Sequence, residues 1–88
     1  MSAGRALARL GRVAESEREL RRAVRAFEEL DDQWWQALSL RYLGETHLDA
    51  GGAAAALEPL RQARAIYRSL GNEAGMRRTL ELLRRAEA

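Results

Sequence analysis

The sequence predicts an all-α protein, a short stack of about five antiparallel helices with no β-sheet. Three observations carry this prediction. The residues that dominate the chain, Ala, Leu, Arg and Glu, all favour helices. No stretch sustains the alternation of apolar and polar side chains that marks a half-buried strand. Glycine and aspartate interrupt the chain at intervals, and a similar pattern of residues returns after 40 positions.

Breaker residues divide the chain into the five expected helices. The breakers are Gly11, Asp31-Asp32, Gly51-Gly52 and Gly71-Asn72. The expected helices cover residues 2–10, 13–30, 33–50, 53–70 and 73–87. Because about two residues join each pair, consecutive helices must run antiparallel. We expect Asp31-Asp32 to cap the third helix and Gly71 to adopt the left-handed conformation that ends the fourth.

Apolar residues at helical spacing support the elements in turn. The first helix, 2–10, is bounded by Gly11. The expected stripes are Leu20, Ala23, Val24, Phe27 and Leu30 in the second helix; Leu40, Leu43, Gly44, His47 and Gly51 in the third; Leu57, Leu60, Ala63, Tyr67 and Leu70 in the fourth; and Met76, Leu80 and Leu83 in the last. Pro59 lies about one turn into the fourth helix, where it removes one backbone hydrogen bond.

Length and composition limit the classes of function. The 88 residues form one small domain, 1–88, and 47% hydrophobic with 32% charged residues is typical of a globular chain. No apolar stretch reaches the ~18 residues of a membrane span, and residues 1–5 hold no apolar signal-peptide core. The absence of cysteine excludes disulfides and thiolate metal sites. We therefore expect a cytoplasmic protein without a cofactor or a metal.

A 40-residue register relates the two halves of the chain. The matched pairs are Gly4 and Gly44, Gly11 and Gly51, Leu20 and Leu60, Ala23 and Ala63, Phe27 and Tyr67, and Leu30 and Leu70. A third copy begins where Leu40 matches Leu80 and Leu43 matches Leu83. Because glycines and core positions match, the repeat is structural, and a period of 20–50 residues indicates a solenoid.

The repeated residues resemble a tetratricopeptide repeat of the longer, roughly 40-residue variety. Leu40-x-x-Leu43-Gly44-x-x-His47-x-x-x-Gly51 resembles helix A of that family, and Ala56-x-x-x-Leu60-x-x-Ala63 resembles helix B. The segment Ile66-Tyr67-x-x-Leu70-Gly71-Asn72 is similar to the loop of kinesin light chains and of actinobacterial regulatory ATPases. Two positions depart from the pattern, since Ser16 replaces the small alanine of helix B and Arg84 replaces the glycine of helix A. The resemblance implies a non-catalytic protein that binds other proteins.

The resemblance also implies a binding groove along the third helix. Starting from Trp34, residues spaced by four, three, four and three positions share one side of this helix, which faces away from Leu40, Leu43 and His47. In the family, the corresponding positions line the concave surface. These candidate partner-binding residues are Trp34, Leu38, Arg41, Glu45 and Leu48. Trp35 and Tyr42 project to a flank, toward Phe27. The alternative is that both tryptophans simply pack between helices.

Residues that could carry other chemistry have simpler interpretations. His47 is better explained as a packed histidine than as a general base, and Asp31-Asp32 as a helix end and cap than as paired catalytic carboxylates. Gly51-Gly52 lacks the Lys and Ser or Thr of a phosphate loop. No catalytic residue is therefore predicted. The clusters Arg21-Arg22-Arg25 and Arg77-Arg78-Arg84-Arg85 share their helices with glutamates, which favours solvated faces over nucleic-acid binding.

The last helix raises the question of self-association. If Met76, Leu80 and Leu83 face inward, then Thr79, Leu82 and Ala86 form a second apolar strip without a covering helix. Such a strip favours a homodimer, whereas the neighbouring arginines favour a solvated monomer. The leading hypothesis remains a protein-interaction module that binds a peptide or protein segment, within a larger bacterial regulator if the resemblance extends so far. Self-association and, less favoured, arginine-mediated nucleic-acid binding are the alternatives.

Overall fold

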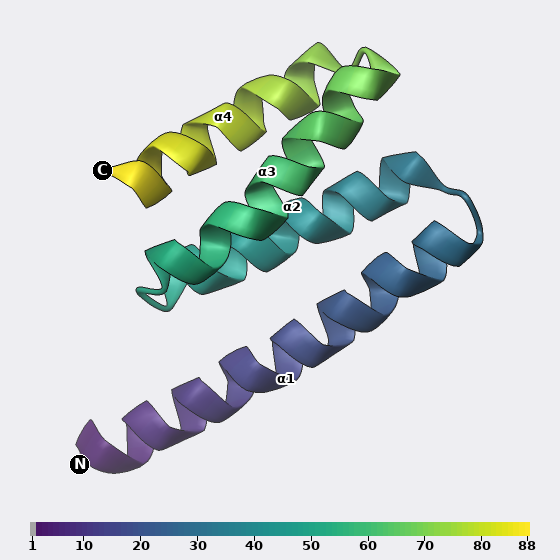
Figure 1. The fold of residues 1–88 in the computed structure, drawn as a ribbon. Helices are drawn as coiled ribbons and strands as arrows, with labels where there is room; N and C mark the ends of the chain where they lie inside the picture. Colours follow the sequence, from purple (N-terminus) through teal and green to yellow (C-terminus); the bar gives the residue numbers. More distant parts are fainter. Residues whose placement is uncertain (1) are drawn as a thin grey trace.

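The computed structural model describes the backbone of residues 2–88 and the side chains of residues 11–88. Four α-helices, α1 (Ser2–Glu29), α2 (Gln33–Asp49), α3 (Ala53–Leu70) and α4 (Glu73–Glu87), follow one another in antiparallel pairs, and the described residues contain no strand (Figure 1). The prediction of an all-α repeat class is confirmed. Within the described part of the chain, no helix is both long and apolar enough to cross a membrane.

The number of helices differs from the prediction, because 2–10 and 13–30 form the single helix α1. Gly11 does not end a helix. It has no left-handed φ and stands alone, whereas each true break has two or three non-helical residues. One interior glycine costs a helix only about 1 kcal/mol, which 28 residues of helix can absorb. The side chains of residues 1–10, including the predicted match at Gly4, lie outside the described residues.

The three turns share one geometry and recur every 20 residues. Asp31, Gly51 and Gly71 each have a left-handed φ, of 58°, 81° and 68°. At each turn the following residue, Asp32, Gly52 or Asn72, donates its backbone N–H to a carbonyl five residues earlier, the Schellman pattern that satisfies a helix end. Two of these residues also start the next helix. The Asp32 carboxylate accepts from the Trp35 N–H at 3.3 Å, and the Asn72 side chain accepts from the Gly75 N–H at 2.9 Å. The predicted caps at Asp32 and Gly71 are confirmed.

The core forms where α2 and α3 meet. Gly44 lies against Leu60 so closely that a Cβ atom at position 44 would collide with the leucine side chain. Two clusters of buried residues extend from this crossing. One comprises Ala56, Leu60, Leu82, Leu83 and Ala86, and the other Ala37, Leu40, Ala63 and Tyr67. Small residues thus allow the two helices to pack closely. Leu30 and Leu70, by contrast, are exposed to 73% and 41%, so these ends of the predicted stripes were wrong.

Helix α4 faces inward with the side predicted to be uncovered. Thr79 and Leu82 are fully buried and Ala86 is 9% exposed, whereas Leu80, predicted to pack inward, is 37% exposed. The expectation of an exposed strip at Thr79, Leu82 and Ala86 was therefore wrong. Because these residues are buried within the domain, they give no support for a homodimer. Gly75 lies against the Tyr67 ring, and this contact fixes the rotation of α4. The Thr79 hydroxyl can be buried because it donates to the Gly75 carbonyl at 2.7 Å.

Helix α2 contacts all three other helices. Its remaining face is open, and this face positions the candidate site.

The buried small residues yield a first test. Ala63 is 0% exposed in the core, and Arg64 next to it is exposed. We expect Ala63→Leu to lower the free energy of unfolding by about 1–3 kcal/mol because the core has no space for the added atoms. Arg64→Ala should change it by less than about 0.5 kcal/mol. Urea denaturation of both variants measures the difference, and equal stabilities would contradict the assigned packing.

The shared turn geometry yields a second test. Asp31 and Gly71 occupy equivalent left-handed positions, but only glycine adopts this conformation without steric cost. Asp31→Gly should therefore raise the free energy of unfolding by up to about 1 kcal/mol, and Gly71→Ala should lower it by a similar amount. A Cβ at position 71 meets no atom within 4 Å, so backbone strain is the only expected cause. Thermal unfolding shifts of the same sign in both variants would exclude this explanation.

Candidate functional site

The candidate site is the side of α2 that points away from α3, here called the open face and defined by Trp34, Trp35, Leu38, Tyr42, Glu45 and Asp49. Three large aromatic side chains lie on it, and Trp34, Trp35 and Tyr42 are 48%, 47% and 46% exposed. The opposite side of α2 carries the buried residues Ala37, Leu40, Leu43 and Gly44. Because that side is fixed against the core, the aromatic residues must face outward.

The aromatic end of the open face is ordered by contacts with α1. The Trp35 ring stacks on Phe27 of α1, with centroids 6.0 Å apart and planes 22° from parallel. Trp34 meets Trp35 edge to face at a centroid distance of 4.7 Å. The predicted proximity of Trp35 and Phe27 is confirmed. Such pairs hold the rings in defined orientations, so about half of each indole remains available to a ligand without further ordering.

Arg41 lies beneath the open face rather than on it. Its side chain is only 19% exposed, and its guanidinium carbon lies 5.6 Å from the Tyr42 ring centroid and 6.0 Å from that of Tyr67. These distances allow cation–π attraction to both rings. Burial raises the pKa of the Tyr67 phenol, and the nearby Arg41 charge opposes the rise.

The carboxylates of the open face connect α2 to α4. Glu45 lies 3.6 Å from Arg78 of α4 and 3.9 Å from Arg41, and Asp49 lies 3.7 Å from Arg85 of α4. All three separations exceed ordinary hydrogen-bond length. The two pairs with α4 are partly or largely exposed to solvent, and such ion pairs each contribute about 0–1 kcal/mol. These carboxylates therefore attract α4 only weakly.

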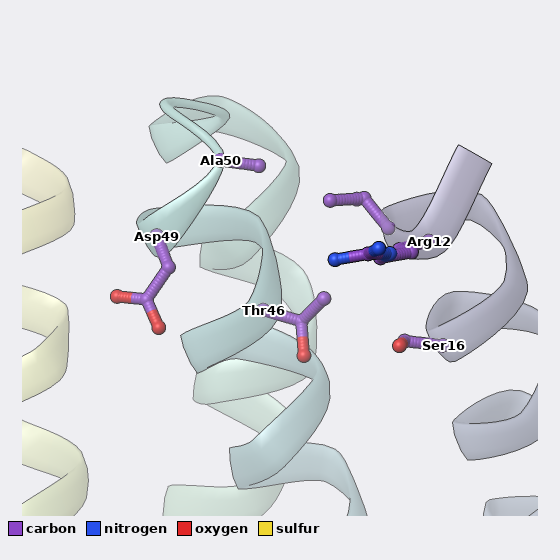
Figure 2. Close-up of a pocket in the computed structure, with 6 residues that line it drawn as sticks. Arg12, Ser16, Thr46, Asp49 and Ala50 are labelled. Carbon is purple, nitrogen blue, oxygen red and sulfur yellow. The ribbon is translucent and has the colours of Figure 1, made fainter. Parts of the chain in front are cut away.

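Two shallow hollows lie between α1 and α2. The larger, of about 420 Å³, is lined by Ser16, Glu19 and Leu20 of α1 and by Tyr42, Glu45, Thr46 and Asp49 of α2. The smaller, of about 220 Å³, lies toward the end of α2 and is lined by Arg12, Val13, Ser16, Thr46, Asp49 and Ala50. Figure 2 shows Arg12 and Ser16 on the side of α1 facing Thr46, whereas the Asp49 carboxylate points away from α1. The open face thus has an aromatic end and a hollow, acidic end.

His47 occupies the interface of α1 and α2 and does not form part of the open face. Its side chain is 12% exposed, and its Nε2 lies 3.7 Å from the Glu17 carboxylate. Glu17 in turn accepts a hydrogen bond from Arg21 at 2.9 Å, which is the main reason its pKa is lowered. Among the described residues, no group of three or more His, Cys, Asp and Glu side chains is arranged to hold a metal ion.

The structure brings together only part of the predicted groove. Trp34, Leu38 and Glu45 lie on the open face, and Arg41 lies largely beneath it. Leu48 is half-buried and packs against the cluster around Leu60 and Leu82, so we leave it out of the site. The predicted groove residues lie too close to α4, because that prediction assumed that Leu40, Leu43 and His47 mark the side of α2 facing the core. The small residues Ala37 and Gly44 mark the true direction of closest packing.

Sequence reasoning missed several residues of the site. Tyr42 and Trp35 were expected on a flank, and none of the hollow residues was expected at a binding surface: Ser16, Glu19, Leu20, Thr46 and Asp49. Using Ala37 and Gly44 as the core direction would have placed Tyr42 and Asp49 on the outward face. The residues contributed by α1 have no such signal, because their place depends on how α1 crosses α2.

Paired antiparallel helices stacked in a 40-residue register, with one open face, define a helical repeat protein. A family model described as tetratricopeptide repeat matches residues 1–69. The chain therefore belongs to the tetratricopeptide repeat family, as its sequence pattern indicated. This family is typically a non-catalytic module, and its repeats generally mediate protein–protein interaction. No curated protein and no solved structure matched the chain.

The environment of Tyr67 allows a test by titration. In a Tyr42→Phe variant Tyr67 is the sole tyrosine, because the chain has two. Its phenol should ionise above the ordinary value of 10.0, since burial disfavours the charged form. The raised pKa means that the folded state favours the neutral phenol, so the free energy of unfolding should fall as pH rises past 10.0. Tyrosinate absorbance against pH measures the pKa, and ionisation at or below 10.0 would contradict the described burial.

Proposed function

We propose that this protein is a non-catalytic interaction module that binds a segment of a partner protein along the open face of α2. The observation that carries the proposal is the grouping of three half-exposed aromatic side chains on one helix, Trp34, Trp35 and Tyr42. Exposed aromatic residues are enriched at interfaces, where they bury large areas at low entropic cost. Membership of the tetratricopeptide repeat family supports the same function.

The orientation of the aromatic side chains adds to this support. Trp34 and Trp35 are held by each other and by Phe27, so a partner would bind a surface that is already ordered. Leu38, half-buried between them and Tyr42, continues the apolar surface along the helix. We expect the partner segment to place its own apolar side chains over this end.

Nucleic-acid binding finds less support in the arginine clusters. Arg21 pairs with Glu17, Arg78 with Glu45 and Glu81, and Arg85 with Asp49. A nucleic acid would have to compete with these carboxylates for the arginines. A cytoplasmic location and a place within a larger bacterial regulator stay predictions from the sequence.

The proposal is tested by selecting binders and mutating the open face. A library of random peptides displayed on phage is selected against the wild-type protein, and the affinity of a labelled selected peptide is measured by fluorescence anisotropy. Trp34→Ala should weaken binding about tenfold, the effect typical of an important interface aromatic. The matched control is Leu80→Ala, which removes an exposed apolar side chain from α4.

Circular dichroism separates loss of binding from loss of fold. Trp34 is 48% exposed, so Trp34→Ala should retain the helical spectrum and unfold at nearly the wild-type temperature. If selected peptides bind Trp34→Ala and Leu80→Ala equally well, the open face is not the binding surface. If Trp34→Ala unfolds the domain, the tryptophan is structural, and the alternative interpretation from the sequence is correct.

A further inference from the structure

A second concave surface lies on the buried side of α2, opposite the open face. Helices α1 and α3 both pack on α2, but in the described part of the chain no Cα atoms of α1 and α3 lie within 8 Å of each other. Two adjoining hollows, of about 120 and 80 Å³, lie between them. We call this surface the α1–α3 groove, and its lining includes Arg21 and Arg25 of α1, Leu40 and Leu43 of α2, and Ala55 and Gln62 of α3.

The smaller hollow of the α1–α3 groove has an apolar floor. Leu40 and Leu43 of α2 lie at its base, and Ala55 and Pro59 of α3 form one side. The two leucines are 4% and 1% exposed, so a ligand reaches only the edges of their side chains. A helix with its side chains is about 10 Å wide, so the hollow suits a single inserted side chain rather than a whole helix.

The α1 side of the groove carries unpaired positive charge. Arg21 and Arg25 line the larger hollow from successive turns of α1, and Arg22 lies next to Arg25 at a spacing of three residues. Among the described residues, Arg22 and Arg25 form neither a hydrogen bond nor an ion pair, and the glutamates one turn after Arg25 do not pair with it. Arg21 donates its Nε–H to Glu17, which leaves its other N–H groups available.

The α3 side of the groove carries little net charge. Glu58 is the only carboxylate among the described residues that line the groove, and it accepts a hydrogen bond from Gln62 at 3.0 Å. Arg61, three residues after Glu58, is exposed and has no hydrogen bond or ion pair within the described chain. An acidic side chain is therefore attracted to the α1 side, whereas a ligand that is negative along its whole length also meets Glu58.

We propose that the α1–α3 groove binds an acidic segment of a partner protein, with an apolar side chain in the smaller hollow and a neighbouring carboxylate paired with Arg22 and Arg25. This site is separate from the open face and does not depend on the function proposed there. The apolar hollow favours a peptide over a nucleic acid, because a chain of phosphates would pair with the arginines but leave the hollow unfilled. The arginines attract and orient the segment, and the inserted side chain anchors it.

The test uses the phage-displayed library with random segments of about twelve residues, long enough to cover the groove in extended form. Affinities of labelled selected peptides are measured by fluorescence anisotropy. Peptides that bind the groove should carry Asp or Glu within about two positions of an aliphatic residue, because the two hollows adjoin and an extended chain rises about 3.3 Å per residue. Replacing that acidic residue with Ala should weaken binding about tenfold.

A charge-matched pair of protein variants locates the acidic end of the partner. The groove variant combines Arg22→Gln, Arg25→Gln and Arg61→Gln. The control variant combines Arg64→Gln, Arg77→Gln and Arg84→Gln, which makes the same change in net charge at exposed positions that do not line the groove. The groove variant should bind the acidic peptides about tenfold more weakly than the control variant and should lose most of the salt dependence. All six arginines are exposed, so circular dichroism should show that both variants retain the fold.

A second pair of variants tests the apolar hollow without changing charge. Ala54 and Ala55 are exposed neighbours in the first turn of α3, and only Ala55 lines the groove. Ala55→Trp should fill the smaller hollow and weaken the acidic peptides about tenfold. Ala54→Trp should leave their affinity within about twofold of the wild type.

The outcomes distinguish this site from the open face. If every selected peptide depends on Trp34 and none distinguishes the groove variant from the control variant, the groove proposal is overturned and the function proposed above stands. Groove-binding peptides without acidic residues, or equal effects of Ala54→Trp and Ala55→Trp, also overturn it. If acidic peptides depend on the groove and no peptide depends on Trp34, the groove proposal stands and the open face fails. If no peptide binds the wild-type protein, both proposals fail.

A nucleic-acid probe and a single substitution complete the test. Labelled random-sequence single-stranded RNA and duplex DNA are titrated in the same assay. If either binds the wild type, weakens with the groove variant and is unaffected by Ala55→Trp, the surface binds nucleic acid and the proposal is overturned. If the groove variant unfolds, Arg25→Gln alone must still weaken the acidic peptides relative to Arg64→Gln, since both positions are exposed.

Discussion

The close approach of α2 and α3 at Gly44 and Leu60 is the contact on which the rest of the structure depends. A single Cβ atom at position 44 would collide with the Leu60 side chain, so the crossing point permits only glycine without displacement. Both buried clusters extend from this crossing, one toward α4 and the other toward Val24 of α1. Fixing α2 against α3 also fixes which side of α2 faces outward. The aromatic residues are exposed because the small residues are buried.

This arrangement explains how so short a chain can leave one side of α2 exposed. One helix pair cannot bury all its apolar surface, and α1 and α4 cover part of what α2 and α3 leave exposed. The second and third copies of the repeat differ in a way that fits these roles. Positions Ala37 and Gly44 of α2, which pack on α3, correspond in the 40-residue register to Arg77 and Arg84 of α4. Both arginines are exposed, so the outer side of α4 is a solvated surface.

The turns were predictable because they depend on local residues. The rotation of α4 and the residues that α1 contributes to the candidate site depend on tertiary contacts, so the sequence alone did not predict them. Asp32 caps α2 with its carboxylate, and Gly71 ends α3 in a left-handed conformation that the absence of a side chain permits. Both roles were predicted correctly. Gly11 was misjudged because one glycine weakens a helix without supplying the second breaker that a turn needs. The rotation of α4 could not be predicted, since its two strips are similarly apolar and the choice depends on Gly75 meeting the Tyr67 ring. The candidate site was also only partly predictable. The outward residues of α2 follow from its helical spacing, whereas Glu19 and Leu20 of α1 lie beside them only because of how α1 crosses α2.

A double-mutant cycle between positions 44 and 60 tests the central constraint most directly. Gly44→Ala, Leu60→Ala and the double variant are compared with the wild type by urea denaturation, in a stabilising osmolyte so that all four remain folded. The account predicts that Gly44→Ala is costly beside Leu60 but much less so when Leu60→Ala is also present, because the added methyl group then occupies the vacated space. The coupling should reach at least about 1 kcal/mol. Strictly additive effects would show that the two residues do not set the distance between α2 and α3, and would contradict the account.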